Sequence, residues 1–421
     1  MNILHVTQLY HPSKGGTQTH IKGLSEQLVR WDQEVSVFAA RALENRDLLQ
    51  PNGHCSFLPE FETVNGVGVR RFTVNAAAQE FLFHRVQDVR GGYRFSKMVL
   101  GDYLPIMNFG PFVPRMMAEI IKDNPDIIMA ANMSALTSLF AVWAASIGRI
   151  PLIIMPCLHV YDTWADLPGV YKLIQRAEAV IALTPFEKRY LMAHGIREDK
   201  IHVIGAGIEP PKAPKDCSFA FMEKYRIEHP VVTYLGRLIE SKGIETLLKA
   251  MKQLWDRGVT AQLLIAGKSQ LDYVAELEHR MDVILSPTDR QRVIVIEDFD
   301  DREKTDILAA SDMLVLPSKT ESFGIVFLEA WSVGVPCLAC RETACADVVE
   351  DQHDGLLFEY DHHAELAAKI QALIENPERR KQLGANGREK VLKHYTWDQV
   401  GTRILNVYRS LVNTNQMLGK G

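Results

Sequence analysis

The stretch PSKTESFGIVFLEAWSVGVP at residues 317–336 decides the fold class, because it joins a polar loop to an apolar helix that a glycine ends. It follows the apolar run MLVL, so we predict a buried strand, the loop SKTESFG and the helix IVFLEAWSVG. Glu321 then lies in the loop, and Glu329 lies about two turns inside the helix. A carboxylate on an apolar helix is unfavourable unless it accepts hydrogen bonds. Two acids at this spacing predict that each holds hydroxyl groups at one end of a sugar nucleotide.

The same alternation of apolar strands and amphipathic helices continues on both sides of this stretch. Near-continuous apolar strands separated by helices indicate parallel sheets covered on both faces, so we predict an α/β protein with two doubly wound domains and a cleft between them. In such sheets ligands bind outside the carboxyl ends of the strands. The expected strands are NILHVT, EVSVFAA, VGVRRFTV, IIMAAN, PLIIMP and AVIALT in the first half, and VVTYLG, QLLIAG, RVIVIE, MLVLPS, PCLACR and GLLFE in the second.

The proline-rich segment EPPKAPKDCS at residues 209–218 separates the two halves and has the composition of a linker. We therefore predict an N-terminal domain over 1–208, a linker over 209–230 and a C-terminal domain over 231–394. The last segment, 395–421, is amphipathic with a thin apolar stripe that bears aromatic residues. We expect it to pack back across the N-terminal domain, with an oligomer contact as the alternative.

Composition and charge exclude several classes of protein. At 421 residues the chain is long enough for two cores, and its net charge of −5 argues against a general nucleic-acid binder. The uncharged run at 131–148 contains Asn, Ser and Thr, which favours a buried helix over a membrane span. No basic segment precedes the first apolar run, so we expect a cytoplasmic protein. The cysteines of CLACRETAC lack a partner cluster, which favours core packing over a metal site.

The loop GRLIESKG at 236–243 has the chemistry of a diphosphate site. Arg237 offers a forked set of donors and Lys242 a compact cation, and the following helix would add N-terminal amides. A solvated turn with two surface cations is the alternative interpretation.

Two segments of the first half have a similar position after a strand. Gly15 and Gly16 precede a helix, where backbone could approach an anion closely. His159 follows the strand PLIIM and could hydrogen-bond a sugar hydroxyl or stabilise developing charge. A structural turn and a packed surface histidine are the respective alternatives.

Together these stretches resemble the retaining glycosyltransferases of family 4, which have the GT-B architecture of two Rossmann-like domains. The resemblance is strongest from Val231 to about Phe358 and weaker over residues 2–211. Its most specific element is the acid pair of ESFGIVFLE, combined with GRLIESKG upstream.

The resemblance implies a role for each matching residue. Glu321 would face the donor sugar and Glu329 the ribose, while Arg237 and Lys242 would hold the diphosphate and stabilise it as the leaving group. His159 would lie near the reacting sugar. The remaining donor contacts would come from Gly15, Gly16, Phe323, Gly324, Ile325 and Val326. We expect transfer of a hexose from a nucleotide sugar, most often a UDP-hexose, with retention of anomeric configuration and without a metal or other cofactor.

Some segments depart from the family pattern. The strand QLLIA is followed by GKSQL, where the family frequently has GxG, and EDFDD at 297–301 stands where a glycine is common. These segments would border the nucleotide base, so the resemblance predicts diphosphate binding more firmly than the identity of the base. The DxD pattern of EDFDD could instead chelate a divalent metal, although acids before a helix are usually N-caps. A sugar-nucleotide epimerase, a phosphorylase and a non-catalytic sugar-nucleotide sensor are the other hypotheses.

The acceptor is less clearly encoded than the donor. The segment at 80–97 interleaves phenylalanine and tyrosine with arginine and lysine, which suits an anionic membrane or a lipid-linked acceptor. A helix pair with a solvated face is the alternative. We expect a carbohydrate or lipid-linked acceptor, with peripheral membrane contact through this segment.

Overall fold

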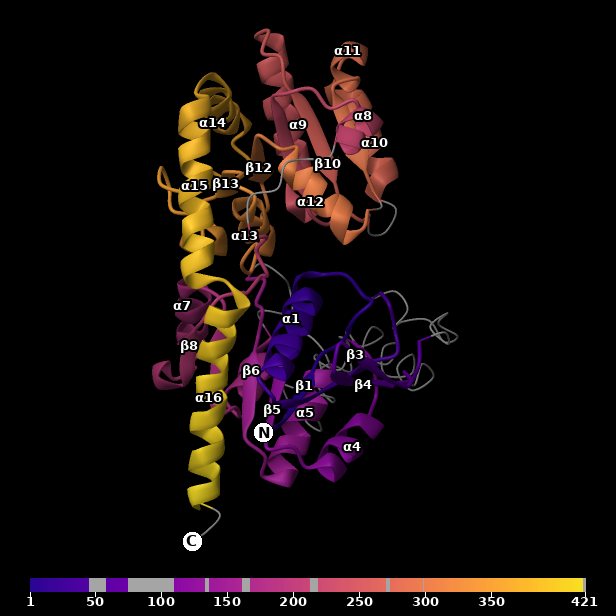
Figure 1. The fold of residues 1–421 in the computed structure, drawn as a ribbon, viewed down its shortest axis with the longest axis vertical. Helices are drawn as coiled ribbons and strands as arrows, with labels where there is room; N and C mark the ends of the chain where they lie inside the picture. Colours follow the sequence, from indigo (N-terminus) through magenta and orange to yellow (C-terminus); the bar gives the residue numbers. More distant parts are fainter. Residues whose placement is uncertain are drawn as a thin grey trace, which may run out of the picture. The chain divides into compact units, whose positions relative to one another are not determined.

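Two α/β units, each built on its own mainly parallel sheet, make up the chain (Figure 1). The computed structural model describes residues 1–44, 58–74, 110–132, 136–160, 167–212, 219–269, 273–297 and 299–418. Unit 1 comprises Met1–Gly207 and Trp397–Gly421, and unit 2 comprises Ile208–Thr396. The prediction of two Rossmann-like domains is confirmed.

Unit 1 has an eight-stranded sheet in the order β3-β4-β2-β1-β5-β6-β7-β8, in which only β3 runs antiparallel to its neighbour. Its strands are β1 (Asn2–Val6), β2 (Glu34–Ala40), β3 (Phe61–Val64), β4 (Val67–Phe72), β5 (Ile127–Ala131), β6 (Leu152–Met155), β7 (Ala179–Ala182) and β8 (Ile201–Val203). Its helices are α1 (Gly16–Arg30), α4 (Arg115–Asp123), α5 (Leu136–Gly148), α6 (Pro168–Ile174), α7 (Pro185–Ala193), α16 (Trp397–Leu418) and the 3₁₀ turn η4 (Glu198–Lys200).

Unit 2 has a six-stranded parallel sheet in the order β11-β10-β9-β12-β13-β14. Its strands are β9 (Val231–Leu235), β10 (Gln262–Ala266), β11 (Val293–Ile296), β12 (Met313–Leu316), β13 (Cys337–Cys340) and β14 (Gly355–Phe358). Its helices are α8 (Phe219–Tyr225), α9 (Ile244–Asp256), α10 (Tyr273–Ile284), α11 (Pro287–Arg290), α12 (Asp301–Ala309), α13 (Ile325–Ser332), α14 (His363–Glu375), α15 (Pro377–His394) and the 3₁₀ turns η5 (Glu240–Lys242) and η6 (Ala344–Asp347).

The central strands of both sheets are buried on both faces, as their unbroken apolar sequences require. All five residues of β5 and of β9 are buried, as are all four residues of β6, β12 and β13. The twelve strands expected from the sequence are present. Two further strands escaped prediction, β3 and the three-residue β8, and both lie at edges of the sheet in unit 1.

The apolar run at 131–148 forms the buried helix α5, and no helix among the described residues is both long and apolar enough to cross a bilayer. The four cysteines within the described ranges, Cys157, Cys337, Cys340 and Cys345, are buried and unpaired by disulfides. The segment predicted as a linker over 209–230 contains the short helix α8 (Phe219–Tyr225).

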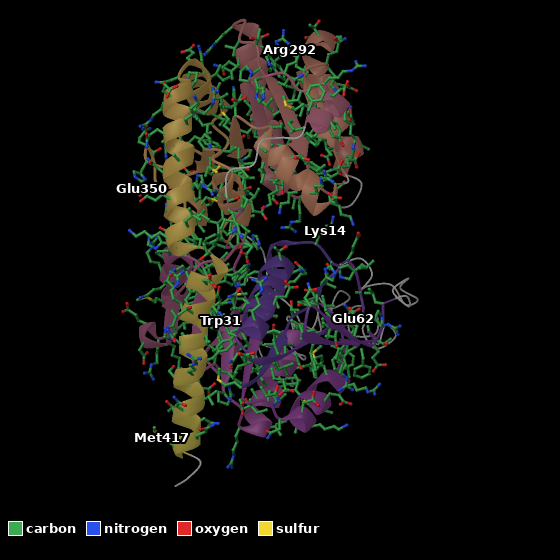
Figure 2. The ribbon with its side chains drawn as sticks, in the orientation of Figure 1. Lys14, Trp31, Glu62, Arg292, Glu350 and Met417 are labelled. Atoms are coloured by element: carbon green, nitrogen blue, oxygen red, sulfur yellow. The ribbon has the colours of Figure 1, made fainter. Side chains whose placement is uncertain are left out.

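Helix α16 returns the chain to unit 1 and packs along α1 (Figure 1). The hydroxyl of Tyr408 lies 3.0 Å from Nε2 of the buried His5. Trp31, at the end of α1, approaches Gly401 so closely that a methyl group there would lie 3.0 Å from the indole (Figure 2). Gly23 and Gly207 likewise leave room for the indole of Trp397.

Candidate functional site

The sheet order of unit 2 brings two of the predicted loops together. Counting from its first strand, the order is 3-2-1-4-5-6, so the topology changes direction between β9 and β12. Ligands of doubly wound sheets bind outside the carboxyl ends of the strands at such a point. The loop after β9 is GRLIESKG and the loop after β12 is PSKTESFG, which the sequence predicted as the phosphate and sugar segments.

Glycines allow the backbones of these loops to approach one another. Gly243 has φ 69° at the N-cap of α9, and a Cβ there would lie 2.0 Å from the carbonyl oxygen of Pro317. The amide of Lys319 donates to the carbonyl of Ser241 at 2.9 Å. A side chain at position 243 would therefore separate the two loops.

An ion pair joins the same loops. Nζ of Lys242 lies 2.6 Å from Oε2 of Glu321 and 3.4 Å from the carbonyl oxygen of Thr320. Only 6% of Lys242 is exposed, and 15% of the Glu321 side chain. An ammonium group has three donors. These oxygens take two of the donors, and no third hydrogen bond of this ammonium group is found among the residues that the structure describes.

Arg237 presents the second cation. Its side chain is exposed, and it makes no hydrogen bond or ion pair with the residues that the structure describes. Its backbone is fixed, since the hydroxyl of the buried Tyr234 donates to the Arg237 carbonyl at 2.6 Å. The neighbouring turn is tight as well, because a Cβ at Gly267 would lie 1.7 Å from the Gly236 carbonyl oxygen.

Helix α13 starts at the same edge of the sheet. Its N-cap, Gly324, has φ 83°, and the first-turn residues Ile325 and Val326 are half-buried. The first amides of a helix lack partners within it and carry partial positive charge, so they favour anions and hydroxyl oxygens. Phe323 is buried against Tyr395, with ring centroids 5.7 Å apart, and this contact anchors the loop before α13 to the core of unit 2.

Glu329 lies farther along α13 and is also paired. Its Oε1 lies 2.5 Å from Nζ of Lys304 in the first turn of α12. The side chains of Glu329 and Lys304 are 19% and 29% exposed, so a ligand can reach the pair. Lys304 was not predicted as a site residue. Its position in DREKTDILAA, directly after the EDFDD segment, is the sequence feature that could have indicated it.

The predicted residues of unit 1 lie at the carboxyl ends of its own strands. Gly15 is the N-cap of α1, and Gly16 is its first residue. His159 is half-buried in the loop after β6. The structure describes each unit by itself, so the joint action of these residues with those of unit 2 stays a prediction.

Two groups of residues bear on the metal alternative. Asp300 is the N-cap of α12 and accepts from the amides of Arg302 and Glu303 at 2.9 and 2.8 Å, whereas residue 298 lies outside the described ranges. Glu350, His353 and Asp354 form an acidic group, but Asp354 is already paired with Lys390 at 2.6 Å. The segment 80–97, predicted to contact membranes, lies outside the described residues.

Comparisons with known proteins agree over nearly the whole chain. Residues 15–207 match the family model of the glycosyl transferase 4-like domain, and residues 220–390 match that of the glycosyl transferases group 1. The chain belongs to the glycosyltransferases of the GT-B fold and is family 4-like. The family predicted from ESFGIVFLE and GRLIESKG is thereby confirmed.

Relatives of this glycosyltransferase match most or all of its length. An uncharacterized glycosyltransferase of Methanocaldococcus jannaschii is 23% identical over 100% of both chains. A GDP-mannose-dependent mannosyltransferase of Corynebacterium glutamicum, which acts on a monoacylated phosphatidylinositol monomannoside, is 27% identical over 71% of this chain and 81% of its own. The crystal structure of Anabaena HepE in complex with UDP and glucose superimposes with a TM-score of 0.73 at 20% identity, covering 98% of this chain and 100% of HepE.

Proposed function

We propose that this glycosyltransferase transfers a hexose from a nucleotide diphosphate sugar with retention of anomeric configuration and without a metal ion. The observation that carries the proposal is the Lys242–Glu321 pair at the change of direction between β9 and β12. It sets a cation directly beside a carboxylate. That arrangement fits a phosphate next to a hydroxylated ring.

Each of the predicted residues has a part in this proposal. Arg237 and Lys242 bind the diphosphate, and the first amides of α13 receive phosphate or hydroxyl oxygens. Glu321 accepts from hydroxyls of the donor sugar, while Glu329 accepts from the ribose. Gly15, Gly16 and His159 of unit 1 act on the phosphate and the reacting sugar.

The proposed reaction needs no protein nucleophile. The bond between the anomeric carbon and the phosphate oxygen breaks, and the leaving oxygen takes the proton of the acceptor hydroxyl on the same face of the sugar. The new glycosidic bond then forms on that face, so the configuration is kept. Cations that stabilise the departing diphosphate, together with fixed positions for both reactants, lower the barrier.

UDP is the proposed nucleotide, supported by the UDP-bound HepE structure of the same fold. GDP is the alternative, because the mannosyltransferase relative of Corynebacterium glutamicum depends on GDP-mannose. The acceptor is proposed to be a carbohydrate, a lipid-linked molecule or a small hydroxylated molecule.

Two other functions compete with transfer. An epimerase needs acid–base groups on both faces of the sugar, and His159 is the one candidate that the sequence offers. A non-catalytic sensor would bind the sugar nucleotide without releasing UDP. Product analysis separates all three.

The deciding experiment incubates the protein with UDP-glucose, UDP-galactose and GDP-mannose, with and without a panel of sugar and lipid-linked acceptors, in EDTA. NMR of the product reports the anomeric configuration. Retention with full activity in EDTA is the expected result. An inverted product would exclude the same-face mechanism, loss of activity in EDTA would restore the metal hypothesis, and binding without turnover would favour a sensor.

A further inference from the structure

We propose that Glu187 is a positioning residue that fixes the loop bearing His159 by tying the carboxyl end of β6 to that of β7. Its relevance to catalysis rests on the proposed function of His159. Its effect on the loop does not depend on that function.

The carboxylate of Glu187 accepts one backbone hydrogen bond from each of two loops. Oε1 lies 2.9 Å from the amide of Leu158, the residue before His159, and Oε2 lies 2.7 Å from the amide of Leu183 after β7. Glu187 is only 2% exposed. A glutamate in this third helical position usually returns to the start of its own helix, and Thr184 does cap the Glu187 amide here. The bond to Leu158 reaches beyond that local arrangement.

The loop that Glu187 holds has a backbone conformation that needs support. Cys157 has φ 52°, in the left-handed region that residues other than glycine rarely adopt. Such a conformation persists only where its surroundings determine it. The Glu187–Leu158 hydrogen bond acts on the very next peptide, so it stabilises the turn that presents His159.

The same loop is connected to the glycine segment of unit 1. The side chain of Thr17, which follows Gly16, and the backbone of Asn132 after β5 both act on the Cys157 thiol by lowering its pKa, although burial raises that pKa more. Glu187 therefore holds a segment that lies near the start of α1 and the end of β5 as well as β7. Gly16 at the start of α1 and His159 after β6 are the residues predicted to act on the donor.

The charge state of Glu187 determines how strongly it accepts from the two amides. Burial raises its pKa to about 7, against the two amide hydrogen bonds, which lower it. Cys157 is the titratable group placed against it, and burial raises the pKa of that thiol to about 12, so it stays neutral. Protonation of Glu187 at lower pH removes its negative charge and turns one oxygen into a hydroxyl, which is a weaker acceptor for an amide than a carboxylate oxygen. The loop therefore loosens as the pH falls through about 7.

Kinetics with Glu187→Gln test the inference, and Glu178→Gln is its matched control. Glu178 accepts from the amide of Leu152 at 2.8 Å, so it tethers the opposite end of the same strand, β6. With UDP-glucose hydrolysis as the readout, Glu187→Gln lowers kcat about ten- to hundredfold at unchanged KM. We expect the wild-type rate to fall on the acid side of about pH 7, Glu187→Gln to lack this acid limb, and Glu178→Gln to keep both the rate and the limb.

The combination with His159→Ala locates the effect. Glu187→Gln added to His159→Ala slows the reaction no further, because both changes act through the imidazole. Full additivity would overturn the positioning role. Full activity of His159→Ala would instead overturn the proposed function of His159, and the exchange measurement below would then decide the role of Glu187 alone.

Amide hydrogen exchange on the wild-type protein provides a second measurement that needs no variant to fold. After correction for intrinsic rates, the amides of Leu158 and Leu183 exchange faster at pH 6 than at pH 8, while that of Leu152 keeps its protection. Equal protection of Leu158 at both pH values would overturn the inference.

Discussion

The two units differ in the charge of their buried polar groups. In unit 2 the loops after β9 and β12 contain an ion pair that is nearly buried, Lys242–Glu321, and an exposed arginine. In unit 1 burial shifts His5, His20 and Glu187 towards their neutral forms: it lowers the pKa of His5 to about 3 and of His20 to about 4, and raises that of Glu187 to about 7. The buried Arg71 of the same unit is paired with Glu62. The loops of unit 2 therefore offer the cations of the proposed diphosphate site, whereas Glu187 in unit 1 fixes two loops by accepting from their backbone amides.

The largest effect is expected when the charge of the unit 2 loops is removed. Lys242→Met removes the proposed phosphate donor and breaks the ion pair with Glu321. Loss of one such group from a preorganised site lowers turnover about 100- to 1,000-fold. The measurement is the rate of UDP release from UDP-glucose.

Lys249→Met is the control for that change, because Lys249 pairs with Glu245 on the surface of α9 and not with either loop. It should stay within about twofold of the wild-type rate. Similar losses in both variants would mean that overall charge, and not the position of Lys242, governs turnover.

A smaller loss, in UDP affinity, is expected when Glu329 is changed, the second acid of ESFGIVFLE. Glu329→Gln removes the charged acceptor proposed for the ribose and lowers UDP affinity about tenfold, as for a hydrogen bond to a charged group. Lys304→Met keeps the carboxylate and loses only its orienting partner, so UDP affinity falls less. Calorimetric titration with UDP compares them. Wild-type affinity in Glu329→Gln would remove Glu329 from the nucleotide site.

The close approach of the two loops can be tested by stability. Gly243 and Gly258 both have positive φ, 69° and 82°, but an added methyl group meets the Pro317 carbonyl only at position 243 and nothing within 4 Å at position 258. Alanine at either position costs about 1 kcal/mol for the backbone conformation, and the clash in Gly243→Ala adds about 1–3 kcal/mol. Denaturant unfolding of the two variants measures the difference. Equal losses would show that the loops can separate freely.

The last effect appears only at acid pH and concerns the buried His20 of unit 1. The pKa of His20 is about 4 in the folded protein and near 6.5 when unfolded, so the unfolded state binds the extra proton between these values and stability falls as the pH drops below about 6.5. His20→Leu therefore reduces the pH dependence between about pH 6.5 and 4 by about 1.4 kcal/mol per pH unit. Glu187 acts in the opposite direction between about pH 7 and 4.5, because its folded pKa is raised.

The control for His20 is His353→Leu, whose side chain is 57% exposed. Urea unfolding at pH 7, 6 and 5 measures both variants. Both nitrogens of the buried His20 ring lack a partner among the described residues, so His20→Leu should also not destabilise the protein at pH 7. An unchanged pH dependence in His20→Leu would show that this histidine is charged in the folded state.

The architecture could be predicted from the sequence because each buried strand coincides with a local run of apolar residues. The exceptions follow from the same rule: β3 (FETV) is exposed or half-buried along its length, β8 has three residues, and α8 is a short helix next to prolines. None of them carries a long apolar run, so periodicity gives no signal.

The candidate site was predictable only as a set of separate loops. Lys242 and Glu321 were both chosen from the sequence, yet their direct contact spans 79 positions and depends on the sheet order. The partnership of Lys304 with Glu329 and of Glu187 with Leu158 depends on tertiary packing in the same way. Residue type and spacing therefore indicate candidate site residues, whereas their side-chain partners can be identified only from the folded structure.

The most direct test of the account is a crystal structure of the protein with UDP. The account predicts phosphate oxygens within hydrogen-bonding distance of Arg237 and Lys242 at the loops after β9 and β12, with the ribose hydroxyls on Glu329. UDP bound away from these loops, with Lys242 still paired only to Glu321 and Thr320, would contradict it.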